Sequence, residues 1–523
     1  MGILNLKREA PLYADHQSGA SGERHKGSQS IAKHTANGYI DLNKRQSGHE
    51  LLMNTPVIYD TFTRALQPLQ PADGATFRFY CCGPTVYGPA HIGNFRTFVV
   101  QDLLRRVIEA AGTTTRHVRN LTDVDDKTIR QSQAEGKSLT AFTTYWRDQF
   151  HADCEALNCL SPHVEPSAVA HIPLQIRMIE QLLAKGHAYV ADDGSVYYRV
   201  QSFDAYGKLS RLEQRQITTT CGHQHAQTDD EYDRESASDF ALWKAHKPED
   251  GPNVWDSPWG PGRPGWHIEC SAMSVEYLGE SFDLHGGGED LVFPHHENEI
   301  AQSEAATGKP FARLWFHSAH LSVEGRKMSK SLGNLYTLAD IQARGFDAMA
   351  LRYVLLSGHY RQPLNFTWDS LKAAQSALRR LRQLGQDLRH AAGEAPVPGA
   401  HTEGPFTPVY DALADNLNTP DALGKWFTVV HTLEKRLHQD ALPAAEAATL
   451  YAAYQHLCDT FGFVFAPDQE SPAPAEVQAL AEERWAAKQA RDFARADALR
   501  NEITDRGWTV QDAKDGYTLA PAS

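Results

Sequence analysis

Long apolar runs are missing from this chain of 523 residues. No segment reaches the ~18 consecutive apolar residues that a membrane-spanning helix requires. The N-terminal region also does not have the charged-then-apolar pattern of a secretory signal peptide. We therefore expect a cytoplasmic protein without a membrane partner.

Cysteine is scarce, and an excess of basic residues is absent. The seven cysteines are an odd number spread over a long chain, whereas disulfide frameworks belong to short secreted sequences. We therefore expect buried thiols or metal ligands. The 65 acidic and 51 basic residues give a formal net charge of −14, so the surface as a whole does not attract nucleic acid. A local basic stripe is still compatible with this charge.

The chain has the composition of an ordinary globular protein, with 41% apolar and 22% charged residues, and its length predicts about three domains. Residues 1–52 are rich in Gly, Ser, His, Asn and Gln and lack apolar periodicity, so we expect this N-terminal extension to be disordered. Residues 393–408 and 466–475 are rich in Pro, Gly and small polar residues and mark two seams.

The apolar periodicity predicts an α/β region followed by an α-helical one. A short buried strand runs from Thr76 to Gly83, and the apolar positions after Phe95 recur at helical spacing. Further strands are predicted at residues 116–121, 282–288 and 313–321, and helices dominate beyond residue 348, as at 371–389 and 477–506. We expect an interrupted parallel sheet.

The segment between the first strand and its helix has the features of a phosphate-binding loop. It consists of His91, Ile92, Gly93 and Asn94, just where unpaired backbone N–H groups and the helix dipole favour an anion. Gly93 allows a nucleotide to approach closely, and the side chains of His91 and Asn94 offer hydrogen bonds to phosphate oxygens. Taken alone, so short a motif also fits an ordinary turn.

A second candidate loop follows a later strand and consists of Lys327, Met328, Ser329, Lys330 and Ser331. Its two ammonium groups and two hydroxyls suit a triphosphate, although lysine-rich loops also occur as solvated surface. Together and in this order, the two loops resemble the paired signatures of class I aminoacyl-tRNA synthetases.

Four potential metal ligands are spread over the same region. Cys82 ends the first strand and Cys270 lies far downstream, while His295 and Glu299 share one face of a helix expected to start at Pro294. Two thiols, an imidazole and a carboxylate are competent zinc ligands, but their spacing is too long for a zinc finger. Taken singly, the cysteines also fit buried apolar positions, and His295 and Glu299 fit a pair on a helix surface.

The chain resembles the cysteinyl-tRNA synthetases in four segments: residues 79–94 (FYCCGPTVYGPAHIGN), 120–127 (NLTDVDDK), 255–273 (WDSPWGPGRPGWHIECSAM) and 282–302, which contains HGGG and FPHHENE. The resemblance extends from about Met53 to the C-terminus and is weakest in the helical tail. It implies a Rossmann-like α/β catalytic domain with an insertion, followed by all-α tRNA-binding domains.

The resemblance also implies a ligand set for one Zn²⁺ per chain, namely Cys82, Cys270, His295 and Glu299, to which the thiolate of the substrate cysteine adds. It assigns the amino-acid backbone to Thr122 and Asp290, and closure of the pocket to Trp266. Three histidines surround the metal in this interpretation: His267, His285 and His296. Ordinary structural roles for Thr122, Asp290 and the histidines, and a core role for Trp266, are alternatives.

The substrates implied are ATP, with Mg²⁺, L-cysteine and tRNA-Cys, and the reaction passes through cysteinyl-adenylate. A monomer is expected. The predicted divisions are an extension at 1–52, a catalytic domain at 53–345 with an insertion at about 150–262, a helical domain at 346–465, and a small anticodon-recognition domain at 466–523.

One residue departs from the family pattern, because Asn94 stands where the first signature ends in histidine. An amide still donates a hydrogen bond but cannot carry charge, so any role for an imidazolium there is in doubt.

In the tail, a basic stripe is expected on one helix, with an aromatic residue beside it for stacking: Arg484, Lys488, Arg491 and Arg495, with Phe493. A solvated helix face is the alternative.

Two other functions are compatible with parts of the sequence. A related ligase could join cysteine to a small amine, as in mycothiol synthesis, and would not need the terminal helices. A non-catalytic zinc-containing RNA-binding module would leave the two phosphate loops without a role. Cysteine-dependent exchange of pyrophosphate into ATP separates the second alternative from the enzymes, and cysteinylation of tRNA separates the two enzymes.

Overall fold

The computed structural model of the chain describes residues 54–212, 238–329, 332–399, 402, 404–465, 473–513 and 516–521. The chain divides into the units Met1–His49 and Glu50–Ser523, and the description below concerns the second. The disorder predicted for residues 1–52, and Lys330 and Ser331 of the second loop, lie outside the described residues.

A four-stranded parallel sheet in the order β10-β9-β3-β4 carries the α/β region. Its strands are β3 (Thr76–Cys81), β4 (Thr114–Arg119), β9 (Phe282–Gly288) and β10 (Ala312–Ser318). The four strands predicted from the sequence are therefore confirmed and belong to one sheet. A short antiparallel hairpin, β1 (Val57–Asp60) and β2 (Ala65–Pro68), precedes them.

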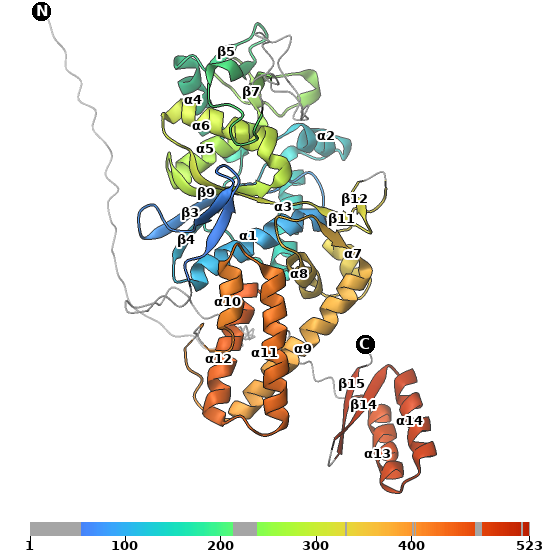
Figure 1. Cartoon of the computed structure of the whole chain (residues 1–523). Coiled ribbons are helices and arrows are strands. Elements are labelled where there is room, and N and C mark those ends of the chain that lie inside the picture. Colours follow the sequence, from blue (N-terminus) through green and yellow to red (C-terminus); the bar gives the residue numbers. More distant parts are fainter. Residues whose placement is uncertain are drawn as a thin grey trace, which may run out of the picture. The chain divides into compact units, whose positions relative to one another are not determined.

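Helices cover both faces of this sheet (Figure 1), which explains the apolar character of its strands. On one face, α1 (Ile92–Ala110) packs against β4 and β9 and also contacts α8 (Ala348–Ser357). On the other face, α5 (Trp266–Leu278) packs against β3 and β4, and α6 (Glu297–Thr307) packs on α5. The resulting α/β architecture agrees with the predicted fold class.

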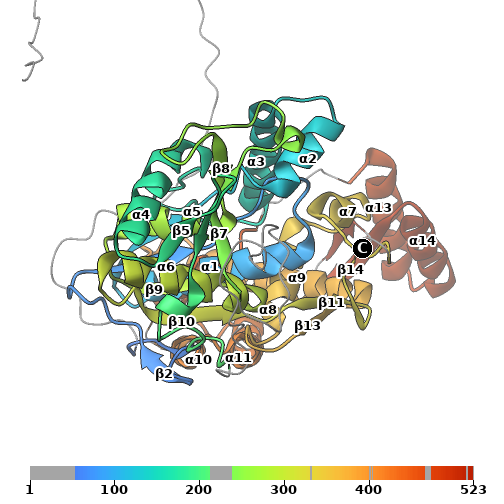
Figure 2. The same cartoon turned by 90° about the horizontal axis from the view of Figure 1, so that it is seen from above.

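The segment between β4 and β9 forms an insertion with its own small sheet. Its helices are α2 (Asp126–Ala134), α3 (Leu139–Ala156) and α4 (Ile172–Ala184), with short 3₁₀ turns η1 (Val169–His171), η2 (Val200–Ser202) and η4 (Pro248–Asp250). Its antiparallel sheet consists of β5 (Ala188–Val190), β6 (Val196–Tyr198), β7 (Phe240–Ala245) and β8 (Gly262–Pro264). Figures 1 and 2 show this sheet and α4 lying above α5 and α6, and α4 contacts both helices.

Beyond β10 the chain becomes helical, as predicted. After a small sheet of β11 (Leu321–Val323), β12 (Arg326–Lys327) and β13 (Leu364–Phe366), the helices are α7 (Leu338–Ala343), α8, α9 (Trp368–Ala392), α10 (Thr407–Ala414), α11 (Thr419–His438) and α12 (Ala444–Phe461). One apolar core includes Phe79 and Leu103 of the α/β region together with Leu381 and Trp426 of these helices. The division predicted between residues 345 and 346 therefore does not separate two cores.

The C-terminal segment has a separate small core made by Val477, Ala481, Ile503 and Val510. It consists of α13 (Ala475–Gln489), α14 (Phe493–Asp505), β14 (Trp508–Ala513) and β15 (Gly516–Pro521). The single helix predicted for residues 477–506 is wrong, because the chain turns between α13 and α14. Arg491 has a φ of 63° there, and the Asp492 side chain caps α14 by accepting the Arg495 N–H at 3.0 Å.

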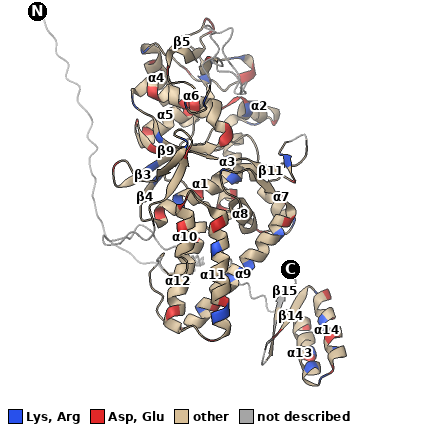
Figure 3. Cartoon of the chain, viewed as in Figure 1, with Lys and Arg blue, Asp and Glu red and all other residues tan. Residues whose placement is uncertain are grey.

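None of the described helices combines the length and apolar character needed to cross a membrane. Lysine and arginine alternate with aspartate and glutamate over the described elements (Figure 3).

Candidate active site

The candidate residues follow the carboxyl ends of the parallel strands. Cys82 comes directly after β3, Thr122 lies three residues after β4, and Asp290 lies two residues after β9. The Cys82 N–H also donates to the Gly286 carbonyl at 3.0 Å, which holds the end of β3 against β9. In a parallel sheet these ends meet at one edge, where α/β proteins bind their ligands.

The first phosphate loop is fixed by a reciprocal cap at the start of α1. The Asn94 N–H donates to His91 Nδ1 at 3.2 Å, and the His91 N–H donates to Asn94 Oδ1 at 3.0 Å. Because Nδ1 accepts, the proton of a neutral His91 ring sits on Nε2 and is available to a ligand. Burial lowers the pKa of His91, which favours this neutral form.

The structure brings the second loop into contact with the first. A Cβ atom on Gly93 would lie 3.1 Å from Met328 Sδ and 3.1 Å from His91 Nδ1, so both loops close on this glycine. The Ile92 N–H donates to the Tyr336 carbonyl at 2.8 Å, which ties the segment after the second loop to the start of α1. A side chain at position 93 would therefore fit only if His91 or Met328 moved by a few tenths of an ångström.

Asn334 braces the described part of the second loop. Its Oδ1 accepts the Ser329 N–H at 2.9 Å, and its Nδ2 donates to the Lys327 carbonyl at 3.1 Å. Lys327 itself is exposed at the end of β12. An ammonium group on a braced strand end suits a polyphosphate ligand.

The four predicted metal ligands lie together, and all four are buried. Cys82 Sγ lies 3.9 Å from Cys270 Sγ and 3.7 Å from Glu299 Oε1, and His295 Nε2 lies 3.1 Å from Glu299 Oε1. A tetrahedral zinc ion with bonds of about 2.3 Å to sulfur and about 2.0 Å to nitrogen or oxygen would separate S/S, S/O and N/O pairs by about 3.8, 3.5 and 3.3 Å. The donor set therefore fits zinc in chemistry and in spacing.

The local backbone at His295 differs from the prediction. The α-helix α6 begins at Glu297 and not at Pro294, because Phe293 has extended dihedrals (φ −138°, ψ 135°) inside the turn η6 (Val292–His296). His295 still meets Glu299, since the last residues of this turn lead directly into the first turn of α6.

The charges in the cluster compensate one another. Burial raises the pKa of Glu299, but His285 and His295 outweigh burial and lower it to about 2. Burial lowers the pKa of His295, but Glu299 and Cys270 raise it to about 10. For Cys270, burial raises the pKa, while hydrogen bonds with Cys82 and His295 bring it down to about 6. The cluster thus favours the anionic forms of Glu299 and Cys270, whereas burial and the neighbouring Cys270 raise the pKa of Cys82. Metal binding would therefore displace protons from Cys82 and His295.

A second set of donors shares two of these residues: Cys82, His285, His296 and Glu299. His285 Nε2 lies 2.9 Å from Glu299 Oε2, and His296 Nε2 lies 3.4 Å from Cys82 Sγ. The other nitrogen of His296, Nδ1, is bonded to His317 at 2.7 Å. Cys82 and Glu299 are common to both sets, so the two sets offer the same two donors.

The predicted pocket residues differ in burial. The half-buried Trp266 ring stacks on His295 at 4.1 Å, and His267 Nδ1 bonds His295 Nδ1 at 2.7 Å. Thr122 is buried, whereas Asp290 is exposed in the turn η5 (Glu289–Leu291).

Sequence reasoning missed Glu269. It is fully buried beside Cys270 and accepts the Thr122 hydroxyl at 3.1 Å, while its Oε1 has no hydrogen-bond partner among the described residues. Burial and the neighbouring Cys270 raise the pKa of Glu269. Its place directly before Cys270 in the sequence W-H-I-E-C is the signal that could have found it.

The five tail residues do not form one stripe. Arg484 is buried and forms a bidentate pair with Asp512 at 2.7 and 2.9 Å, and Lys488 Nζ also binds Asp512 at 2.8 Å. Arg491 lies in the turn after α13, and Arg495 pairs with Glu483 at 2.6 Å. Phe493 is 61% exposed at the start of α14. The predicted stripe is absent because α13 ends at Gln489 and α14 begins only at Phe493, so these residues do not share one helix face.

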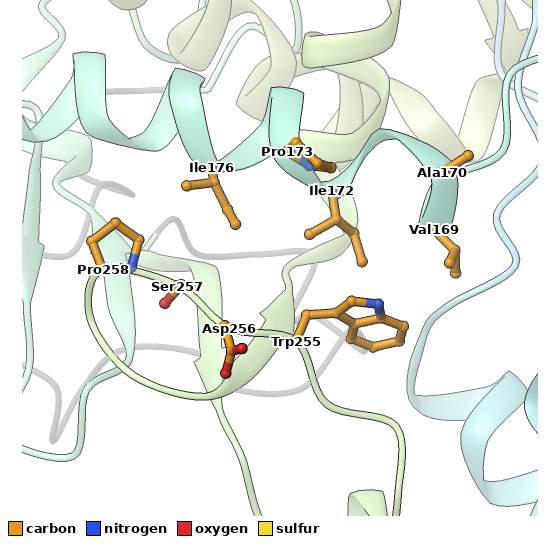
Figure 4. A pocket seen from close by; sticks show the side chains of 9 residues that line it. All are labelled: Val169, Ala170, Ile172, Pro173, Ile176, Trp255, Asp256, Ser257 and Pro258. Carbon is orange, nitrogen blue, oxygen red and sulfur yellow. The ribbon is translucent and has the colours of Figure 1, made fainter.

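A separate shallow cavity of about 590 Å³ lies between η1, α4 and the loop that holds Trp255 and Pro258 (Figure 4). Its lining includes none of the predicted site residues.

Comparisons with known proteins agree with this geometry. Residues 68–376 match the family described as tRNA synthetases class I (C) catalytic domain. The cysteine–tRNA ligase of Opitutus terrae is 57% identical over 472 residues, covering 89% of this chain and 99% of the relative. That of Chlamydia caviae is 42% identical and covers 88% and 96%.

Two solved structures share the fold. The Mycobacterium tuberculosis methionyl-tRNA synthetase with methionyl-adenylate has a TM-score of 0.53 and 14% identity, covering 74% of this chain and 89% of the other. The Agrobacterium radiobacter K84 agnB2 LeuRS–tRNA–LeuAMS complex has a TM-score of 0.54 and 13% identity, covering 74% and 84%.

Proposed function

The chain belongs to the cysteinyl-tRNA synthetases, and from this premise we propose which of its residues bind metal, ATP, cysteine and tRNA. The enzyme is a class I ligase that joins cysteine to tRNA at the expense of ATP, as its similarity to cysteine–tRNA ligases over nearly their whole length shows. The single observation that carries the assignment of the site is the buried cluster of two sulfurs, one imidazole and one carboxylate at the carboxyl edge of the sheet.

Activation needs no nucleophilic side chain. The carboxylate of cysteine attacks the α-phosphate of ATP, cysteinyl-adenylate forms, and pyrophosphate leaves. We assign His91 Nε2–H, Asn94, Lys327 and Lys330 to the phosphates, where they stabilise the charge that builds up on the oxygens. The contact between Gly93 and Met328 supports joint action of the two loops on one ligand. Mg²⁺ is proposed as the companion of ATP.

We assign Cys82, Cys270, His295 and Glu299 as the ligands of one Zn²⁺. The ion supplies a Lewis acid that prefers a thiolate to a hydroxyl, so cysteine is distinguished from serine on binding and a separate editing site is not needed. The chain's own part is to hold two sulfurs within 3.9 Å and to keep Glu299 bonded to His285 at 2.9 Å.

Around this cluster, Thr122 and Asp290 are proposed to hold the amino-acid backbone, and Trp266 to close the pocket. The stacking of Trp266 on His295 supports a place beside the metal ligands. Glu269, bonded to Thr122, orients that hydroxyl.

We propose that residues 466–523 recognise the anticodon. Their separate core supports an independent module. Of the predicted contacts, Arg491 and the exposed Phe493 suit RNA best, because Arg484, Lys488 and Arg495 already pair with carboxylates. The enzyme is further proposed to act as a monomer in the cytoplasm, and sedimentation will test the first point.

The test is cysteine-dependent exchange of labelled pyrophosphate into ATP, followed by charging of tRNA-Cys. We expect exchange with cysteine, none with serine, and charging of tRNA. The alternatives of a small-amine ligase and a non-catalytic RNA-binding module are not favoured, since the relatives match over 99% and 96% of their length. Exchange without tRNA charging would indicate the amine ligase, and the absence of exchange would contradict the assignment of the loops.

A further inference from the structure

A second pair of thiols lies at the C-terminal end of α3, outside the metal cluster. The helix ends in a tight turn in which Asn158 has a φ of 52°, the Cys159 N–H donates to the Cys154 carbonyl at 2.9 Å, and the Asn158 N–H donates to the Glu155 carbonyl at 2.9 Å. This is the Schellman arrangement, which brings the side chains of its first and last residues together. Here these two residues are Cys154 and Cys159.

The two thiols differ in exposure. Cys154 is buried, and Cys159 is half-buried. A hydrogen bond from the Cys154 thiol lowers the pKa of Cys159 and raises that of Cys154. The backbone hydrogen bond between these two residues holds the first and last residues of the turn together, so their side chains are neighbours.

Cationic groups surround Cys159. Arg352 Nη1 lies 3.8 Å from its sulfur, and the Arg119 guanidinium, which packs over the Phe150 ring at 4.9 Å, favours its anionic form. Burial and Asp102 oppose this effect but do not cancel it. Cys81 and Cys458, by contrast, are buried thiols whose pKa values are raised by burial. Among the described cysteines outside the metal cluster, Cys159 is therefore the most reactive nucleophile.

We propose that Cys154 and Cys159 form a hydroperoxide-sensitive thiol pair. The Cys159 thiolate attacks one oxygen of hydrogen peroxide, the O–O bond breaks, and the departing hydroxide takes a proton, which leaves a sulfenic acid on Cys159. The sulfur of Cys154 then loses its proton and attacks Cys159 Sγ, so that the S–O bond breaks and a second water leaves. The two thiols give up two electrons, and one peroxide becomes two waters.

The sequence allows the product to be read without ambiguity. Trypsin releases both cysteines, and no others, on the peptide Asp148–Arg177, whereas cleavage after Glu155 separates them. The zinc-loaded full-length enzyme is treated with hydrogen peroxide. We expect Asp148–Arg177 to lose two hydrogen atoms in mass and its two parts to stay linked after cleavage at Glu155 until reductant is added. Cys458 is the internal control and should remain reduced.

Variants assign the two roles. In Cys154→Ser, the sulfenic acid on Cys159 should accumulate and be trapped by dimedone. In Cys159→Ser, Cys154 should gain no adduct. In the parent enzyme, alkylation of Cys159 at pH 7 should be at least about tenfold faster than that of Cys458. The proposal is overturned if no linked peptide forms before Cys458 oxidises, or if Cys154 reacts equally well in Cys159→Ser.

Discussion

Single atoms decide the chemistry of the candidate metal cluster, because its donors are spaced like the corners of a tetrahedron. The two sulfurs of Cys82 and Cys270 lie 3.9 Å apart, and His295 Nε2 lies 3.1 Å from Glu299 Oε1. These side chains would therefore need to move little to bind a metal ion. Two donor sets share Cys82 and Glu299, so substitutions of the unshared residues distinguish them.

We predict that Cys270→Ser loses bound zinc, since a neutral hydroxyl replaces a soft anionic ligand. The matched variant His285→Asn should keep one zinc per chain with an affinity reduced roughly 10- to 100-fold, because His285 orients Glu299. Metal analysis of protein purified without added zinc measures both. Full zinc in Cys270→Ser together with loss in His285→Asn would favour the second donor set.

Substitutions of Asn94 can separate the effect of a charge at this position on ATP binding from the effect of its side chain on capping of α1. Asn94→Asp keeps an oxygen that accepts the His91 N–H, but it places a negative charge beside the proposed triphosphate. We expect unchanged thermal stability and a roughly tenfold higher KM for ATP, equivalent to ~1.4 kcal/mol.

Asn94→Ala is the control, because it removes the bond from the His91 N–H to the Asn94 side chain and should cost about 1 kcal/mol of stability. Pyrophosphate exchange against ATP concentration gives the KM. An aspartate variant with the KM of the parent enzyme would show that Asn94 does not face the phosphates.

The sequence alone could indicate single site residues where few roles require the same combination of side chains. It could not indicate ion pairs whose two partners are far apart in the sequence. Two thiols, His295 and Glu299 could be singled out because few roles require this combination. The burial of Arg484 could not, since its partner Asp512 comes from a strand beyond the next helix. The buried carboxylate of Glu269 depends on the packing of α5 against the end of β4 and has no periodic signature.

Between elements, α1 and α8 are joined to α12 by a buried ion pair. Arg352 of α8 binds Asp102 of α1, and its Nε donates to the Phe461 carbonyl at 2.8 Å. Burial raises the pKa of Asp102, but Arg106 and Arg352 lower it to about 2. The pKa of the Asp102 carboxyl group is thus held below its ordinary value.

This depression predicts a specific acid sensitivity. The lowered pKa of Asp102 adds about 2 kcal/mol to the free energy of unfolding above about pH 4. This stabilisation is lost as the pH falls toward 2, where Asp102 takes up a proton in the folded state. Asp102→Asn should therefore show a smaller fall in unfolding free energy between pH 7 and pH 2 than the parent enzyme. Urea unfolding at several pH values measures it.

The exposed Asp369 supplies the control, because it pairs with Lys372, which is also exposed. Asp369→Asn should follow the pH dependence of the parent enzyme. If Asp102→Asn also follows it, the ion pair does not contribute to acid stability.

In the C-terminal segment, Arg484 and Arg491 should behave differently. Arg484→Gln leaves Asp512 without its bidentate partner, so we expect lower thermal stability of this segment and weaker tRNA binding as a consequence. Arg491→Gln should leave stability unchanged and reduce the salt dependence of tRNA binding by about one phosphate contact. Thermal melts and binding at several salt concentrations separate the two. Equal salt slopes for Arg491→Gln and the parent enzyme would exclude this contact.

The type of each helix or strand could be predicted better than the residues at which it begins and ends. All four strands of the parallel sheet could be recognised from short apolar runs. The break between α13 and α14 could not be recognised, because Arg491 has a left-handed φ and arginine shows no preference for that conformation. The start of α6 was placed too early, at Pro294, whereas Phe293 has the extended backbone that a residue before proline favours and α6 begins at Glu297.

Across the whole molecule, activation and tRNA recognition should be separable. Deletion of residues 466–523 removes the small core around Val477 and Ile503 but no residue of the core shared by the sheet and the helices. We expect cysteine-dependent pyrophosphate exchange to persist while tRNA charging falls sharply. Loss of exchange in a truncated enzyme that still unfolds in one cooperative transition would mean that this segment also supports activation.

The strand order β10-β9-β3-β4 also has a consequence for synthesis on the ribosome. β3 and β4 emerge early, but the second neighbour of β3 arrives only after residues 120–281 have been translated. At about 5–20 residues per second, β9 is translated about 10–30 s after β4, and one edge of β3 stays unpaired during that time. Cys82 lacks Cys270 until residue 270 is made and lacks Glu299 until after β9, so the nascent chain exposes an unpartnered thiol and an open strand edge to chaperones and to neighbouring polysomes.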